Sequence, residues 1–291
     1  MIKKIPVPYP MPPAIDEKVR EKQMAIAIEQ GFPMLKARVI GNETITIVGY
    51  GPSLEDTWKE IKPPLITMSG SLKFLLEKGL KPGPGWFHVD VDPRSHKLAL
   101  LGLHPEVTYL MGSVCHPKAW EVLKGMKVFL WHAMSGDHTP EWIRDNHVDN
   151  MLVAAGSCIG LCAVHIGGVL GYRRFEIHGF DGSWRGDKRH AGIHTGMLQG
   201  KLEAINPSGR KFITSRLMAN SNEEVKYMLK NFPIFCVFHG DGLMQDWVST
   251  CGLWNAAVDG TSKAESIRHL AFRMVSKTEA MRLMQSGVPV L

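Results

Sequence analysis

Short apolar runs rich in β-branched and aromatic residues alternate with helix-like segments along most of the chain, and this alternation constrains the fold more than any other feature. Such alternation is typical of a mostly parallel sheet covered by helices on both faces. The expected strands are Thr44–Val48, Leu65–Met68, Trp86–Val91, Val107–Met111, Val128–Trp131, Phe175–His178, Phe212–Thr214 and Ile234–Phe238. The expected helices include Ser71–Leu80, Pro117–Lys124, Ile159–Leu170 and Asn222–Asn231. We therefore predict an α/β fold.

The alternating pattern predicts three parts of the chain. Residues 1–43 should form an arm and a helix, because five prolines fall among the first 14 residues and a helical pattern then runs up to Gly31. Residues 44–250 should form the α/β domain, and residues 251–291 a helical tail. Within the domain, the glycine-rich and basic segment Gly182–Gly209 reads as a long loop, which in a compact domain is usually functional or disordered.

Composition limits the class of protein and its partners. With 291 residues and 44% hydrophobic content, the chain is long enough to bury a core of its own. The net charge of +6 favours an anionic partner such as a nucleotide, a phosphorylated small molecule or nucleic acid. The basic residues are scattered, however, so a generic solvated surface explains the charge equally well.

The cysteines and the apolar runs bear on where the protein works. Five cysteines, an odd number in largely apolar contexts, suit a reducing compartment better than a disulfide framework. The spacing of Cys158 and Cys162, with no second pair nearby, is poor support for a zinc-thiolate site. No apolar run reaches the length of a membrane helix, and the proline-rich start does not resemble a signal peptide. We expect a cytoplasmic protein.

A glycine-rich turn follows the first expected strand in the stretch IVGYGPSLEDTW. Gly49, Gly51, Pro52 and Ser53 lie directly before an acidic segment that looks like the start of a helix, with Ser53 as its cap. Such a junction can bring backbone N–H groups close to a phosphate. It lacks the lysine of a Walker A loop and is not GxGxxG, so a tight turn without a ligand remains the alternative.

A second glycine junction and an aspartate belong to the stretch AAGSCIGLCAVHIGGVLGYRRFEIHGFDGS. Gly156 and Ser157 should open the helix that follows, and would offer further backbone donors. Asp181 falls just past the carboxyl end of a strand, where ligands of open α/β sheets bind. Its carboxylate could hold a ribose hydroxyl, a metal or an attacking group, or could simply form a turn.

Two further groups are candidates for the chemistry. Asp90 and Asp92 share one face of an expected strand, a spacing that lets carboxylates approach one divalent ion, and Asp92 is the better placed of the two for Mg²⁺. His190 and His194 lie four residues apart in the basic loop. Either can act as an acid or base near pH 7, and the alternatives are solvated side chains or an adventitious metal pair.

The ordered motifs carry a family resemblance. The pieces Gly49-Tyr50-Gly51-Pro52-Ser53-Leu54, Gly156-Ser157 with Gly160, and Gly179-Phe180-Asp181 resemble the 6-hydroxymethylpterin diphosphokinase MptE-like family, which is related to the motility-accessory-factor glycosyltransferases. Two later pieces, Arg189-His190-Ala191-Gly192 and His239-Gly240-Asp241-Gly242-Leu243, look like its bacteriophage branch. The same order also resembles bacterial sialyltransferases that use CMP-sialic acid, although Ser69 stands where those enzymes have a nucleotide-binding asparagine.

The resemblance implies a Rossmann-like sheet and a nucleotide site. By position, the residues that would bind the nucleotide are Gly49, Gly51, Pro52, Ser53, Ser69, Gly156 and Ser157. Asp92, Asp181 and His190 become the candidate catalytic residues, with Asp92 also the candidate Mg²⁺ ligand.

Four functions remain open at this point. The first is transfer of diphosphate from ATP to a hydroxymethyl-type acceptor, which requires mainly positioning and charge neutralisation. The second is glycosyl transfer from a nucleotide-sugar, with His190 or Asp181 as the base. The third is a nucleotide-binding or virion-associated protein without catalysis. Modification of hydroxymethylated bases in phage DNA would combine such an acceptor with the positive charge of the chain, so nucleic acid stays a candidate partner, as does a second copy of the chain.

Overall fold

The computed structural model describes residues 14–134, 138–146, 151–154, 156–192, 200–206 and 208–250. The expected arm, the expected tail and His194 lie outside these residues, and the three-part division stays a prediction. Among the described helices, none is both long enough and apolar enough to cross a bilayer.

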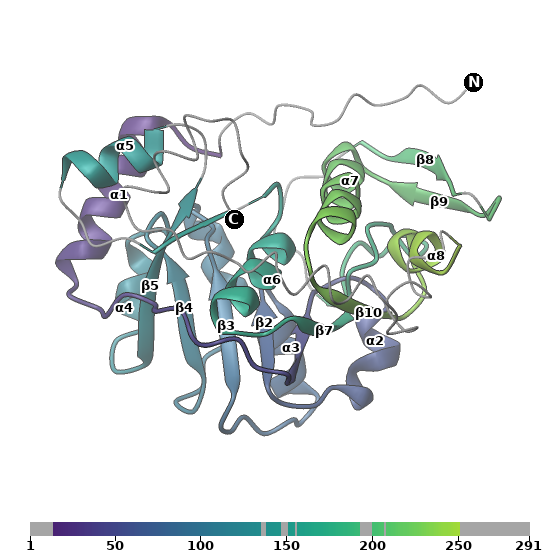
Figure 1. The fold of residues 1–291 in the computed structure, drawn as a ribbon, viewed down its shortest axis with the longest axis horizontal. Coiled ribbons are helices and arrows are strands. Elements are labelled where there is room, and N and C mark those ends of the chain that lie inside the picture. Colours follow the sequence, from purple (N-terminus) through teal and green to yellow (C-terminus); the bar gives the residue numbers. More distant parts are fainter. Residues whose placement is uncertain are drawn as a thin grey trace.

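The predicted α/β fold is confirmed by an eight-stranded sheet in which every neighbouring pair of strands is parallel (Figure 1). The strand order is β10-β7-β1-β2-β3-β4-β5-β6. The strands are β1 (Thr44–Val48), β2 (Leu65–Met68), β3 (Trp86–Asp90), β4 (Thr108–Gly112), β5 (Lys127–Met134), β6 (Leu152–Ala154), β7 (Arg174–His178) and β10 (Phe235–His239). A separate antiparallel hairpin is formed by β8 (Leu202–Ile205) and β9 (Lys211–Thr214).

Helices cover both faces of the sheet, and each face has its own apolar core. The helices are α1 (Glu17–Glu29), α2 (Leu54–Thr57), α3 (Ser71–Glu77), α4 (Lys118–Val122), α5 (His138–Asp145), α6 (Ile159–Val169), α7 (Arg216–Asn231) and α8 (Leu243–Thr250), with 3₁₀ turns η1 (Trp58–Glu60) and η2 (Ser95–Leu100). One core joins the sheet to α6, α7 and α8, and the other joins it to α2, α3 and α4. Every residue of β2 and β4 is buried, because strands covered on both faces need no polar side.

The structure differs from the sequence expectations in the region after β7. Phe212–Thr214 does not join the main sheet but pairs with β8, a strand that lies inside the segment expected to be a long loop. Exposed and buried residues alternate along β9, which is the pattern of a sheet with one solvated face. The hairpin is anchored to α8, because the side-chain amide of Asn206 donates to the carboxylate of Asp246 at 3.1 Å.

The structure also refines two expected helix starts. Ser53 occupies the N-cap position of α2, as expected, but its side chain makes no capping bond and donates to Asp181 instead. The helix expected to open at Gly156 and Ser157 begins at Ile159 instead. Gly156 has a φ of +61°, a left-handed conformation that ends the preceding segment rather than starting a helix. The strand β6 and the helices α5 and α8 were not expected from the sequence.

Candidate functional site

A pocket opens at the carboxyl ends of β1, β2 and β7, where the order of the sheet reverses. From β1 the chain builds the sheet outward through β2 to β6, and it then returns to place β7 on the opposite side of β1. In open α/β sheets, ligands bind at the carboxyl ends of the strands, at the point where the strand order reverses in this way. The pocket holds about 210 Å³. It extends between the sheet edge and the helices α6 and α7.

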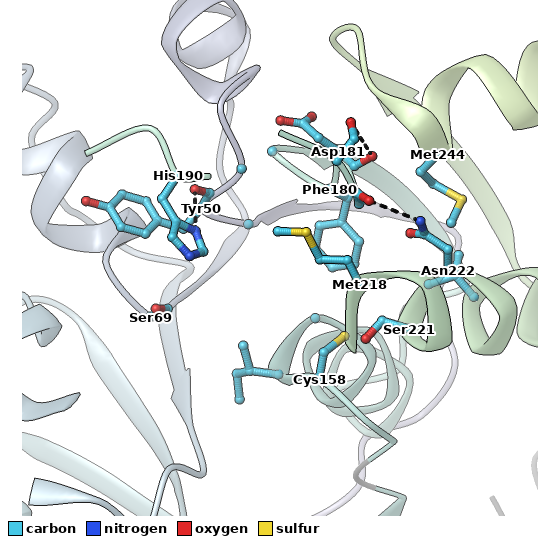
Figure 2. Close-up of a pocket in the computed structure, with 18 of the residues that line it drawn as sticks. Tyr50, Ser69, Cys158, Phe180, Asp181, His190, Met218, Ser221, Asn222 and Met244 are labelled. Atoms are coloured by element: carbon cyan, nitrogen blue, oxygen red, sulfur yellow. Dashed lines mark hydrogen bonds between the residues drawn. The ribbon is translucent and has the colours of Figure 1, made fainter. Parts of the chain in front are cut away.

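The two walls of the pocket differ in character (Figure 2). Tyr50, Ser69 and His190 lie on one side, contributed by the loops that follow β1, β2 and β7. Opposite them, the side chains from α6, α7, α8 and their flanking residues include Cys158, Met218, Ser221, Asn222 and Met244. The pocket is thus mostly apolar with a few polar groups, as small-molecule sites usually are.

The glycines of the first loop allow two loops of the protein to pack together. A Cβ atom on Gly49 would lie 2.5 Å from the carbonyl oxygen of Gly179, and one on Gly51 would lie 2.7 Å from a carboxylate oxygen of Asp181. The loops after β1 and β7 are therefore in backbone contact. Gly49 and Gly51 thus allow a close approach of the backbone, as expected, but the group that approaches them in the structure is the loop after β7.

The N–H groups of the same loop already have acceptors inside the protein. Gly49 donates to the carbonyl of His178 at 2.8 Å, and Gly51 to the carbonyl of Gly179 at 2.8 Å. Ser53 N–H donates to the carboxylate of Asp181 at 2.7 Å. Leu54 N–H, at the start of α2, donates to the carbonyl of Gly51 at 3.1 Å. The expected phosphate cradle of backbone donors is therefore engaged in holding the loops together, and Pro52 and Ser53 lie outside the lining of the pocket.

Asp181 holds together, through hydrogen bonds, the loops that form the pocket. It is 3% exposed and accepts hydrogen bonds from the N–H and the hydroxyl of Ser53 and from the side-chain amide of Gln245, the last at 3.1 Å. Burial raises the pKa of this carboxyl, while the bonds from Ser53 and Gln245 act in the opposite direction. Asp181 lines the pocket, yet both of its oxygens are occupied, so its geometry is that of a positioning residue.

Asp92 is held away from the pocket by an arginine. Both of its carboxylate oxygens accept from the guanidinium of Arg94, at 2.8 and 2.6 Å, and Asp92 is not among the lining residues. This arrangement does not fit the expected role of a Mg²⁺ ligand. Its neighbour Asp90 accepts from the N–H groups of Val91 and Asp92 instead. Burial is the main cause that raises the pKa of Asp90 to about 6.

His190 is the sequence-predicted candidate best placed toward a ligand. It lines the pocket and stacks on Tyr50 with ring centroids 5.4 Å apart (Figure 2). Its Nδ1 lies 3.2 Å from the carbonyl oxygen of Tyr50. Because a carbonyl can only accept, Nδ1 carries the proton, and Nε2 is the basic nitrogen of the neutral ring. In this tautomer Nε2, which is buried in the structure, is the nitrogen that can take up a proton.

Gly156 and Ser157 face α7 rather than the pocket. Ser157 N–H donates to the carboxylate of Glu224 at 2.7 Å, and its hydroxyl lies 2.9 Å from that of Ser221. The amino end of α6 that reaches the pocket is made by Cys158, Ile159 and Gly160 instead. That end of the helix carries a partial positive charge and favours an anion.

Ser69, which the resemblance places at the nucleotide site, lines the pocket and is the non-glycine residue with a left-handed backbone among the described residues, at a φ of 52°. Other lining residues had no clear signal in the sequence. Leu217, Met218, Ser221 and Asn222 come from α7, which follows the hairpin, and only tertiary packing brings them opposite β1. Arg189 also lines the pocket, and burial lowers its pKa. In the sequence, Arg189 lies in a basic stretch and in the piece Arg189-His190-Ala191-Gly192 that carries part of the family resemblance.

Comparison with known proteins defines the family. The family model described as 6-hydroxymethylpterin diphosphokinase MptE-like matches residues 22–187, more than half of the chain. No curated protein shows significant sequence similarity. Among solved structures, the MAf glycosyltransferase from Magnetospirillum magneticum AMB-1 is similar with a TM-score of 0.57 and 13% identity, over 85% of this chain and 45% of that one. This likeness shows the fold, and the chain spans less than half the length of that enzyme. The chain belongs to the 6-hydroxymethylpterin diphosphokinase MptE-like family.

Proposed function

We propose that the protein is a transferase that binds a nucleotide donor in the pocket between β1, β2, β7, α6 and α7. The observation that carries this proposal is the position of the pocket at the reversal of strand order, where α/β proteins bind nucleotides. The family description names a diphosphokinase, which is a transferase. A pocket of about 210 Å³ suits one part of a nucleotide, and the remainder would extend through its mouth.

The charges around the pocket suggest the orientation of such a donor. The amino end of α6 and the guanidinium of Arg189 are the features that favour phosphate oxygens. Met218, Met244 and Phe180 provide the apolar surface against which a nucleoside would pack. We therefore place the phosphates toward Arg189 and α6, and the nucleoside toward α7 and α8.

His190 is the proposed base in the transfer. Its basic Nε2 would take the proton from an acceptor hydroxyl as the oxygen attacks the donor. In the first candidate reaction the donor is ATP, the acceptor carries a hydroxymethyl group, and diphosphate is transferred. Asp181 would act indirectly, because it holds the loop of Tyr50 through Ser53 and thereby the carbonyl that orients His190.

A nucleotide-sugar is the second candidate donor, and one observation favours it. Asp181 is the one carboxylate among the described residues that line the pocket, and its oxygens already accept from Ser53 and Gln245. A diphosphokinase reaction normally depends on a divalent ion that carboxylates help to hold. A glycosyl transfer to a hydroxyl, with His190 as base, does not require further carboxylates among the described residues that line the pocket.

Calorimetry with a panel of donors tests the proposal. ATP, with and without Mg²⁺, and a set of nucleotide-sugars would be titrated into the protein, and mass spectrometry would then show which donor is consumed in the presence of alcohols. Arg189→Met should weaken nucleotide binding about tenfold or more, because a charge-assisted hydrogen bond contributes about 1.5–3 kcal/mol. Arg185→Met is the matched control, since Arg185 pairs with Asp56 outside the lining.

The outcomes separate the alternatives. Consumption of ATP supports diphosphate transfer, and consumption of a nucleotide-sugar supports glycosyl transfer. His190→Gln should then abolish turnover while leaving the binding of the donor within about twofold, because the ring contacts the acceptor in this scheme. Binding without consumption of any donor would favour the non-catalytic nucleotide-binding protein, and equal binding by wild type and Arg189→Met would refute the proposed orientation.

A further inference from the structure

A second group of potential ligands lies at the edge of the sheet, on the strands β7 and β10. Glu176 and His178 point to the same face because they are two residues apart in β7, and His239 is the direct partner of His178 in β10. One side-chain ligand atom from each of the three lies within 4.8 Å of the other two. These residues are not among those that line the nucleotide pocket.

The histidine at the centre of this cluster is buried and has no hydrogen-bond partner. His178 is 0% exposed, and neither of its ring nitrogens has an acceptor or donor within the described residues. A buried polar group without a partner is rare and calls for an explanation such as an ion.

The three side chains of the cluster could reach the geometry of a metal site by rotation. The rings of His178 and His239 are parallel, with centroids 4.1 Å apart. The side chain of His239 is 26% exposed, and its Nδ1 lies 3.5 Å from a carboxylate oxygen of Glu60. A tetrahedral Zn²⁺ with bonds of about 2.0–2.2 Å needs ligand atoms roughly 3.4 Å apart. Rotation of the partly exposed His239 ring and of the Glu176 side chain would bring the three ligand atoms to this separation.

We infer that Glu176, His178 and His239 bind a divalent transition metal of the Zn²⁺ class, with Glu60 or water as the fourth ligand. Two neutral imidazoles and two carboxylates balance the charge of such an ion, and imidazole nitrogen favours zinc over Mg²⁺ or Ca²⁺. The exposed side of His239 and Glu60 provides the path of entry.

The ion would have a structural role, because it connects an edge strand to the loops of the pocket. Among the described strands, β10 pairs with β7 alone, and all five of its residues are only partly buried. The carbonyl of His178 accepts from Gly49 N–H, and that of His239 accepts from the side chain of Gln245 at 3.0 Å. Gln245 in turn donates to Asp181. Fixing His178 and His239 would therefore hold the same loops that Asp181 fastens.

Metal titration of the untagged, chelator-treated protein tests this inference. Zn²⁺ should bind with one equivalent per chain and raise the melting temperature by several degrees, and Co²⁺ should give the absorption spectrum of a tetrahedral site, whereas Mg²⁺ should do neither. His239→Ala should weaken Zn²⁺ binding at least about tenfold and remove the Co²⁺ spectrum. His96→Ala is the control, because His96 is exposed and distant in sequence from the cluster.

Three results would overturn the assignment. The first is wild-type protein that binds no Zn²⁺ at micromolar concentrations, and the second is a His239→Ala variant that keeps the affinity and the Co²⁺ spectrum of the wild type. Glu176→Gln covers the case in which His239→Ala does not fold, since it keeps the size of the side chain and removes a charged ligand. Unchanged Zn²⁺ binding by Glu176→Gln would refute the proposed set of three ligands.

Discussion

Replacing Asp181 by asparagine should loosen the junction between the two loops that form the pocket. The carboxylate accepts from Ser53 N–H through one oxygen, and from the hydroxyl of Ser53 and the amide of Gln245 through the other. An asparagine has a single accepting oxygen. If that oxygen keeps Gln245 and the Ser53 hydroxyl, the new NH₂ group faces Ser53 N–H, so two donors meet in a buried place.

The magnitude follows from these contacts. A hydrogen bond to a charged group contributes about 1.5–3 kcal/mol, and a buried donor left without an acceptor costs about 1–3 kcal/mol. Removing the charge also recovers part of the desolvation that raises the pKa of Asp181, which offsets some of the loss. We therefore expect Asp181→Asn to lower the free energy of unfolding by about 2–4 kcal/mol, which for a chain of this size corresponds to roughly 5–12 °C in the melting temperature.

Urea unfolding followed by tryptophan fluorescence measures this change, with the midpoint and the slope recorded for each variant. Asp187→Asn is the matched control, because that side chain is fully exposed and pairs only with Lys201 at the surface, so its midpoint should not move. If Asp181→Asn unfolds at the wild-type midpoint but forms no product, Asp181 is a group of the reaction and the assignment as a loop fastener is wrong.

Three further predictions concern groups of the core. Burial lowers the pKa of His88 to about 3 from 6.5, so only the unfolded chain takes up this proton between those values. The free energy of unfolding should therefore fall by at most about 5 kcal/mol as the pH decreases from about 6.5 to about 3. Urea unfolding measures this pH dependence, and a His88→Gln variant with the same dependence as the wild type would contradict the prediction. Gly160→Ala would place a Cβ 2.3 Å from the ring of Phe180, so it should lower the melting temperature despite the better helix propensity of alanine. Gly83→Ala is the control, because its Cβ would meet no atom within 4 Å. Equal melting temperatures of the two variants would count against the packing argument. Burial raises the pKa of the Cys115 thiol well above its usual range, so alkylation at pH 8 should modify it only after unfolding, and peptide mass spectrometry that finds rapid labelling of the native protein would disprove its burial.

Local sequence patterns were sufficient for most of the sheet. β1 and β2 begin and end where the expected runs of β-branched and apolar residues begin and end, because strands covered on both faces favour such residues. α6 follows its helical spacing closely for the same kind of reason, since its apolar residues pack on the sheet. The strand β9 shows the limit of such patterns. Its residues predict a strand, but nothing in them says which strand it will pair with.

The sequence by itself therefore determined the class of fold, the family and the segments that meet at one edge of the sheet. Only the tertiary structure decided what each residue does there. Ser53 and Asp181 are 128 positions apart, and their hydrogen bond joins the loop expected to bind phosphate to the loop that carries the expected catalytic acid. In the same way, the guanidinium of Arg94 donates hydrogen bonds to both carboxylate oxygens of Asp92. The physical reason is that a pattern reports the burial and backbone preference of its own segment, whereas a donor or carboxylate is assigned its role by a partner that folding brings from elsewhere in the chain.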